Sequence, residues 1–153
     1  MSYEEIISKI QTCSITDGDE FDLFIDDIAV AVAELNLSVS QREHLIEQLL
    51  FHVERQPDPE FTSWSLIHFI EWLDEDNSTN YNTQLLKSLK RKPTCLTLLL
   101  ANRILNVLDD TSADKISFLT ALKEIASDSN VDQLVRNEAK ELYEYQLSKK
   151  TED

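Results

Sequence analysis

The stretch FTSWSLIHFIEWL, residues 61–73, decides the fold class. Its apolar side chains recur at steps of three and four residues, which is the period of an α-helix and not the alternation of a strand. They surround the helix nearly all the way round, so we expect this segment to lie centrally among other helices. The apolar residues are Phe61, Trp64, Leu66, Ile67, Phe69, Ile70, Trp72 and Leu73.

The same helical spacing continues on both sides of this stretch. Eight helices are expected, starting near residues 2, 19, 40, 62, 79, 94, 112 and 131. Ser40 followed by Glu43 has the spacing of a capping box and is expected to open the third helix, which Pro57 and Pro59 end. Gly18 is the only glycine, so hairpin-rich sheets and glycine-rich phosphate loops are excluded.

The distance between successive helix starts predicts how the helices are arranged. Pairs of helices recur roughly every 40 residues, which is the period of HEAT-like repeats, although no strict sequence repeat is present. We therefore predict an all-α chain of about eight helices in antiparallel pairs, stacked as a short HEAT-like α-solenoid, with an irregular helical bundle as the alternative. Residues 1–148 are expected to form a single helical domain and residues 149–153 a frayed tail. The last two helices are expected to bury Ile116 and Leu134.

Charge is distributed unevenly along the chain. The sequence has 29 acidic and 14 basic residues, giving a net charge of −15. Residues 1–86 hold 18 acidic and 3 basic residues, whereas residues 87–153 hold 11 of each, so the first half carries the whole excess. Such a field repels phosphate backbones and anionic membranes and attracts basic partners. Solubility is the alternative reason for an acidic excess.

Patterns typical of catalysis or metal binding are weak in this chain. His68 and Glu71 lie three residues apart on one helix, but a di-iron bundle needs the order Glu-x-x-His, so a local contact on the helix surface is favoured. Cys13 and Cys95 are far apart and are expected to be free thiols. No nucleophile has a supporting base in sequence context. We expect no enzymatic activity, no cofactor and no metal.

The sequence also shows no pattern typical of a targeting signal. The acidic N-terminal stretch has no long apolar run, which argues against a signal peptide. The most apolar window, residues 95–108, is too short to span a membrane. These features favour a cytoplasmic protein with no membrane partner.

Two acidic clusters in the first half are the candidate binding surface. Acids at the start of the second helix suit its dipole, but dipole complementarity accounts for only a few of them. Trp72 stands beside the second cluster and is either an interface anchor or a core tryptophan. The candidate contact residues are Asp19, Glu20, Asp22, Asp26, Glu71, Trp72, Asp74 and Glu75.

Three short segments carry a resemblance to a known family. SLIHFIE at 65–71, NRILN at 102–106 and EFD at 20–22 are similar to segments of the helical, HEAT-like immunity proteins of bacterial polymorphic toxin systems, including contact-dependent growth inhibition. The likeness extends over residues 1–145. The resemblance implies a protein that binds and neutralises a cognate toxin domain made by the same cell, with no enzymatic activity and no cofactor.

The resemblance and the charge lead to one hypothesis. Nucleases have basic surfaces because they hold phosphates, so an acidic inhibitor can cover such a surface. We predict a one-to-one complex with a basic nuclease toxin, an RNase or tRNase being favoured over a DNase, and no nucleic acid as partner. The alternative is a HEAT-like adaptor that binds a basic host protein in its concave groove.

Overall fold

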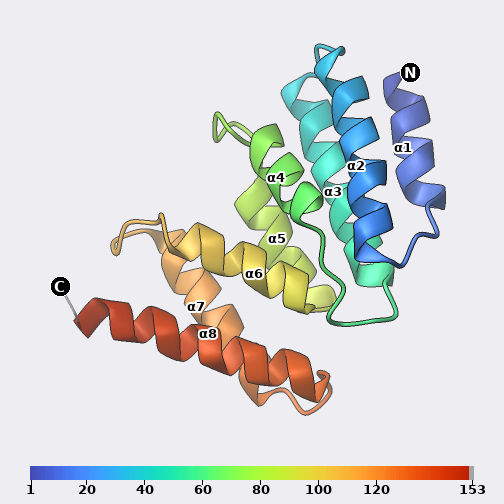
Figure 1. Cartoon of the computed structure of the whole chain (residues 1–153). Coiled ribbons are helices and arrows are strands. Elements are labelled where there is room, and N and C mark those ends of the chain that lie inside the picture. The colour runs from blue at the N-terminus through green and yellow to red at the C-terminus, as the bar shows by residue number, and fades with distance from the viewer. Residues whose placement is uncertain (152–153) are drawn as a thin grey trace.

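The computed structural model describes residues 1–151, and of residues 150 and 151 it describes only the backbone. This part of the chain forms eight α-helices and no strand, which confirms the all-α prediction (Figure 1). Each helix begins within about two residues of its expected start. The helices are α1 (Tyr3–Thr12), α2 (Gly18–Ala33), α3 (Val39–Arg55), α4 (Trp64–Leu73), α5 (Tyr81–Arg91), α6 (Cys95–Leu105), α7 (Ala113–Ser127) and α8 (Gln133–Thr151).

The helices form two layers. Consecutive helices run in opposite directions, and helices two apart in sequence pack side by side, with the exception of α4 and α6 (Figure 1). One layer contains α1, α3, α5 and α7, and the other contains α2, α4, α6 and α8. This packing of antiparallel helix pairs is consistent with both expected architectures, a short α-solenoid and a helical bundle.

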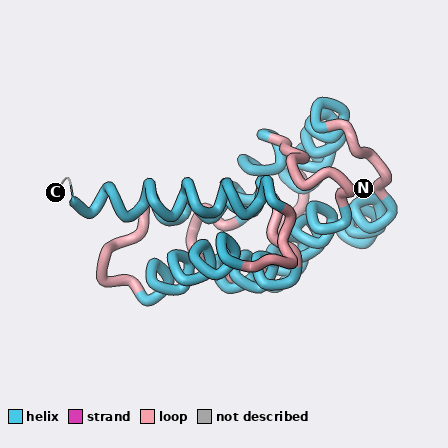
Figure 2. The backbone as a smooth tube through the Cα atoms, turned by 90° about the horizontal axis from the view of Figure 1, so that it is seen from below, coloured by secondary structure: helices cyan, strands magenta, loops and turns pink. Residues whose placement is uncertain are grey.

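The direction of the helix axes changes along the stack. Helices α1, α2 and α3 are roughly aligned, whereas α6 and α8 run at a steep angle to them (Figure 1). The N-terminus and the end of α8 lie at opposite ends of the molecule (Figure 2). In the second layer α2 packs closely on α4 and α6 on α8, but α4 and α6 do not form a close pair. The change in direction therefore falls between α4 and α6.

The core beneath α2 contains a histidine. Phe21 is fully buried, its ring stacks on His52 at a centroid distance of 4.6 Å, and Phe61 meets it edge-on at 5.4 Å. Gln56 Nε2 lies 2.8 Å from His52 Nε2. Burial lowers the pKa of His52 to about 4, and the nearby Arg55 charge adds to this effect. The imidazole is therefore neutral at physiological pH.

The capping box of α3 differs from the prediction. Ser38, not Ser40, precedes the helix with an extended backbone. Ser38 Oγ accepts from the Gln41 amide at 3.1 Å, and Gln41 Oε1 accepts from the Ser38 amide at 3.0 Å. Ser40 and Glu43 already lie inside the helix, so their spacing matched the motif without its geometry.

Two expected core residues lie on the surface. Ile116 is 64% exposed because α7 turns Lys115 inward, and the Lys115 ammonium reaches Asp110 while its stem is buried. Leu134 is 50% exposed because the inward row of α8 begins one residue later, at Val135. In each helix, one residue of the expected apolar stripe faces solvent.

The C-terminal boundary also differs from the prediction. Helix α8 continues through residues 149–151, which were expected to fray. Lys149 Nζ donates to Asn106 Oδ1 at 2.7 Å and lies over the Tyr145 ring at 5.3 Å. These contacts hold the last described turn against α6. Residues 152 and 153, the rest of the expected tail, lie outside the described part.

Candidate protein-binding surface

Helix α4 presents a row of aromatic side chains to solvent. Trp64, His68 and Trp72 are spaced by four residues, so they share one face of the helix. Trp64 is 52% exposed and Trp72 44% exposed, and His68 is exposed between them. The Trp64 and His68 rings stack at 6.1 Å, and Trp72 stacks at 6.1 Å on Phe69, which is buried. The expectation that α4 is apolar all round and fully covered is therefore wrong on this face.

A groove runs between this row and α2. It has a volume of about 440 Å³ and combines small apolar side chains with one carboxylate and the exposed aromatics. Leu23 and Val30 of α2 are also 69% and 65% exposed. We call it the α2–α4 groove; its lining includes Ile25, Asp26, Ala29, Ala33, His68 and Trp72.

The beginnings of α2 and α4 are fixed to each other by polar contacts. Asp22 accepts from Ser63 Oγ at 2.5 Å and from the Ser65 amide at 3.2 Å, so this carboxylate caps α4 from the neighbouring helix. A Cβ on Gly18 would lie 2.5 Å from the Thr62 carbonyl oxygen, so only glycine allows α2 to approach this closely. Asp22 is thus a structural tie between the two helices, made through its Oδ1 atom.

Most acidic residues of the first half have no basic partner. Among the described side chains, the acids of residues 1–86 that pair with an arginine are Glu54, Glu71 and Asp76. Asp19 and Glu20 lie exposed in the first turn of α2, where only their backbone amides are bound, by the Asp17 carboxylate. Of the exposed acids of α2 and its C-cap, Asp26 lines the groove; we call this set the acidic rim, and its members are Asp19, Glu20, Asp26, Asp27 and Glu34.

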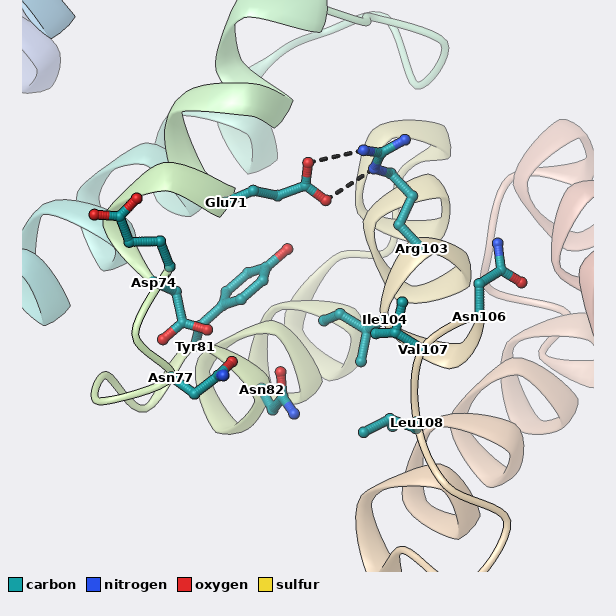
Figure 3. Close-up of a pocket in the computed structure, with 11 residues that line it drawn as sticks. Glu71, Asp74, Asn77, Tyr81, Asn82, Arg103, Ile104, Asn106, Val107 and Leu108 are labelled. Atoms are coloured by element: carbon teal, nitrogen blue, oxygen red, sulfur yellow. Dashed lines mark hydrogen bonds and ion pairs between the residues drawn. The ribbon is translucent and has the colours of Figure 1, made fainter.

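The other candidate acids lie on the opposite side of α4, around a second opening (Figure 3). Glu71 forms a two-point ion pair with Arg103 of α6, with both N–O distances at 2.8 Å. Asp74 accepts from the amide and the hydroxyl of Thr79. Glu75 is exposed. We call this opening, of about 470 Å³, the Tyr81 pocket; its lining includes Glu71, Asp74, Glu75, Tyr81, Arg103 and Val107.

The eight predicted contact residues are therefore divided between two surfaces. Asp26 and Trp72 meet in the α2–α4 groove, whereas Glu71, Asp74 and Glu75 surround the Tyr81 pocket. The exposure of Trp72 excludes the alternative of a core tryptophan. Sequence reasoning placed His68 on the helix surface but missed Trp64 as an exposed residue, although the four-residue spacing of Trp64, His68 and Trp72 was a signal for a shared face.

Other kinds of site receive no support from the described residues. Within residues 1–151 no three His, Cys, Asp or Glu side chains are grouped to hold a metal ion, and His68 Nδ1 lies 3.9 Å from Glu71 Oε1 in a local contact. No helix in this range is long and apolar enough to cross a bilayer. Burial, followed by the charge of Glu138, raises the pKa of the Cys95 thiol to about 11, so it is a poor nucleophile at neutral pH.

Known proteins offer no further guide to these surfaces. No protein-family model, no curated protein and no solved structure matches the chain. A functional assignment must therefore come from the exposed aromatics, the groove and the distribution of charge.

Proposed function

We propose that this protein binds a basic protein domain and neutralises it, as an immunity protein does with a toxin of its own cell. The binding surface is the α2–α4 groove with its acidic rim. The observation that carries this proposal is the exposed Trp64–His68–Trp72 row beside a groove in the half of the chain that holds the whole negative excess.

The aromatic row has the composition of an interface centre. Tryptophan is enriched among the residues that contribute most to binding, and such residues sit in small pockets surrounded by less important polar contacts. Here Trp72 lines a groove floored by Ala29, Ala33 and the buried Phe69. Contiguous exposed apolar surface of this kind is rare on monomers and marks interaction sites.

The acidic rim selects the partner class. Asp26 lies within the groove, and Asp19, Glu20 and Asp27 extend the negative surface along α2. Few acids of this half form ion pairs within the protein. Their negative electrostatic field therefore extends into the solvent and speeds association with a basic protein. A nuclease toxin fits this description, because its substrate-binding surface must be basic to hold phosphates.

Co-expression with the protein encoded immediately upstream tests the proposal. We expect a one-to-one complex whose affinity falls about 30-fold or more in Trp72→Ala, the size of a central interface truncation. Asp26→Lys should weaken it further by placing a positive charge in the groove. Ile116→Ala and Leu134→Ala remove equally exposed side chains elsewhere and should leave affinity unchanged.

Two results would contradict this assignment. Equal affinities for wild type, Trp72→Ala and Asp26→Lys would remove the groove from the interface. Absence of binding to the upstream protein, with capture of a different basic protein through the same groove, would favour an adaptor over an immunity protein.

A further inference from the structure

The Tyr81 pocket contains a buried hydroxyl that has no hydrogen-bond partner. Tyr81 opens α5 and is 4% exposed, and its hydroxyl makes no hydrogen bond. Leaving a buried hydroxyl unpaired is costly, so such groups are uncommon and call for a partner. Figure 3 shows the hydroxyl directed toward the Glu71–Arg103 ion pair, at the pocket's inner side. Burial, then the charges of Glu71 and Asp74, raises the Tyr81 pKa, so the group is a neutral phenol.

The charges around this hydroxyl favour a cation. Three carboxylates, those of Glu71, Asp74 and Glu75, line the pocket with a single positive group, Arg103. The neighbouring amide of Asn82 is already occupied, since its Nδ2 donates to Asp114 Oδ2 at 3.0 Å. The three carboxylates give the pocket a negative field, which suits a donor that carries positive charge.

The pocket wall and rim suit a long side chain with a charged end. Ile104, Val107 and Leu108 of the α6 end form an apolar wall, and Val107 is 83% exposed. The α4–α5 loop that forms the rim is held by Arg42, whose Nη1 donates to the Leu73 carbonyl at 2.9 Å and pairs with Asp76 at 3.2 Å. A fixed rim reduces the ordering cost of binding.

We propose that the Tyr81 pocket receives an arginine side chain of the basic partner, a step that rests on the proposed function. The aliphatic stem lies along Val107, and the guanidinium donates to the Tyr81 oxygen and to the Glu71 carboxylate. The Glu71 and Arg103 side chains are 35% and 36% exposed, so the ion pair can rotate toward solvent and open the hydroxyl without backbone movement. The incoming guanidinium then replaces Arg103 beside Glu71. Arginine fits better than lysine because its planar fork reaches two acceptors at once.

Titration with N-acetyl-arginine amide, followed by NMR of the labelled full chain, tests this pocket without the partner. We expect saturable shifts at Tyr81, Asn82 and Val107 with a dissociation constant of roughly millimolar order. N-acetyl-citrulline amide has the same shape without charge and should bind at least about tenfold more weakly. Tyr81→Phe keeps the ring and should weaken the arginine probe about tenfold. Arg103→Gln frees the Glu71 carboxylate and should strengthen binding of the arginine probe.

A matched control and a second variant keep the test decisive. Glu141→Gln removes an exposed acid of α8 and should not change the titration. If Tyr81→Phe does not fold, Glu75→Gln on the exposed loop should still weaken the probe. Equal binding of the arginine and citrulline probes, or tighter binding in Tyr81→Phe, would overturn the proposal, as would shifts that never saturate. The titration contains no partner protein, so a negative result would not affect the proposal that the α2–α4 groove binds the partner. Conversely, if Trp72→Ala abolishes partner binding but leaves the titration unchanged, the result bears on the groove alone.

Discussion

Helix α4 has a neighbour of its own layer on each side, and the two sides differ. Toward α2 the helices touch, with Gly18 against the Thr62 carbonyl and Asp22 bound to Ser63 and Ser65. Toward α6 they separate, and the gap is bridged by the Glu71–Arg103 ion pair over the Tyr81 hydroxyl. Glu71 and Trp72 are adjacent in sequence but face these two different sides.

The difference follows from how the layer is packed. Close packing of α2 on α4 leaves a groove of about 440 Å³ bordered by exposed aromatics, which suits the macromolecular surface proposed above. The change of axis direction between α4 and α6 leaves an opening of about 470 Å³ lined by more charged side chains, which suits the single side chain proposed above. The two sides of α4 thus differ in packing, and substitutions on each side can separate their contributions to stability.

The largest expected contrast comes from one substitution made on each side of α4. Ile25→Ala, at a residue 1% exposed on the α2 side, should cost about 2–5 kcal/mol of unfolding free energy, because the cavity lies in close packing. Ile104→Ala removes the same atoms from a half-buried position beside the Tyr81 pocket and should cost less than half as much. Urea unfolding of both variants measures the difference. Equal costs would show that the two sides are packed alike.

The pH dependence of stability probes the core beneath α2. His52 has a folded pKa of about 4, below its unfolded value near 6.5, so the unfolded chain binds the proton more readily. The stability that neutral His52 contributes is complete above about pH 6.5 and is lost as the pH falls toward 4, by about 2–3 kcal/mol. Subtracting the unfolding free energy of His52→Gln from that of wild type at each pH isolates the contribution of His52 from that of the carboxylates. A difference between the two proteins that stays constant with pH would contradict this prediction.

A smaller change in stability is expected for a substitution at Gly18, and its sign reports how closely α2 approaches α4. Alanine in place of glycine within a helix usually stabilises a protein by about 0.4–1 kcal/mol. Here the added Cβ meets the Thr62 carbonyl at 2.5 Å, so Gly18→Ala should instead destabilise by about 1–3 kcal/mol as α2 moves off α4. Thermal and urea unfolding report the sign directly. A stabilised variant would mean that the two helices are not held this closely.

The sequence predicted the helices well because apolar spacing is a local property. All eight helix positions followed from it, whereas the direction of individual side chains did not: Ile116 and Leu134 were expected in the core and lie on the surface. The capping box at Ser38 was missed because Ser40 offered the same spacing two residues later. These errors arise where tertiary packing selects among equivalent local choices.

The candidate site was less predictable because it depends on contacts distant in sequence. Negative charge pointed to the half of the chain that forms the α2–α4 groove, but it did not reveal that Asp22 and Glu71 are engaged by Ser63 and Arg103, which lie 41 and 32 residues away. No local pattern reveals such pairs. Trp72 could be read as core or interface until the packing of α2 on α4 exposed it.

The affinity for the upstream-encoded protein as a function of salt concentration tests the central claim most directly. If an acidic groove binds a basic domain, the affinity should be high at low salt and fall steadily as salt rises, with a shallower dependence in Asp26→Asn. Tight binding that is indifferent to salt and to Asp26 would contradict the proposed role of the acidic rim.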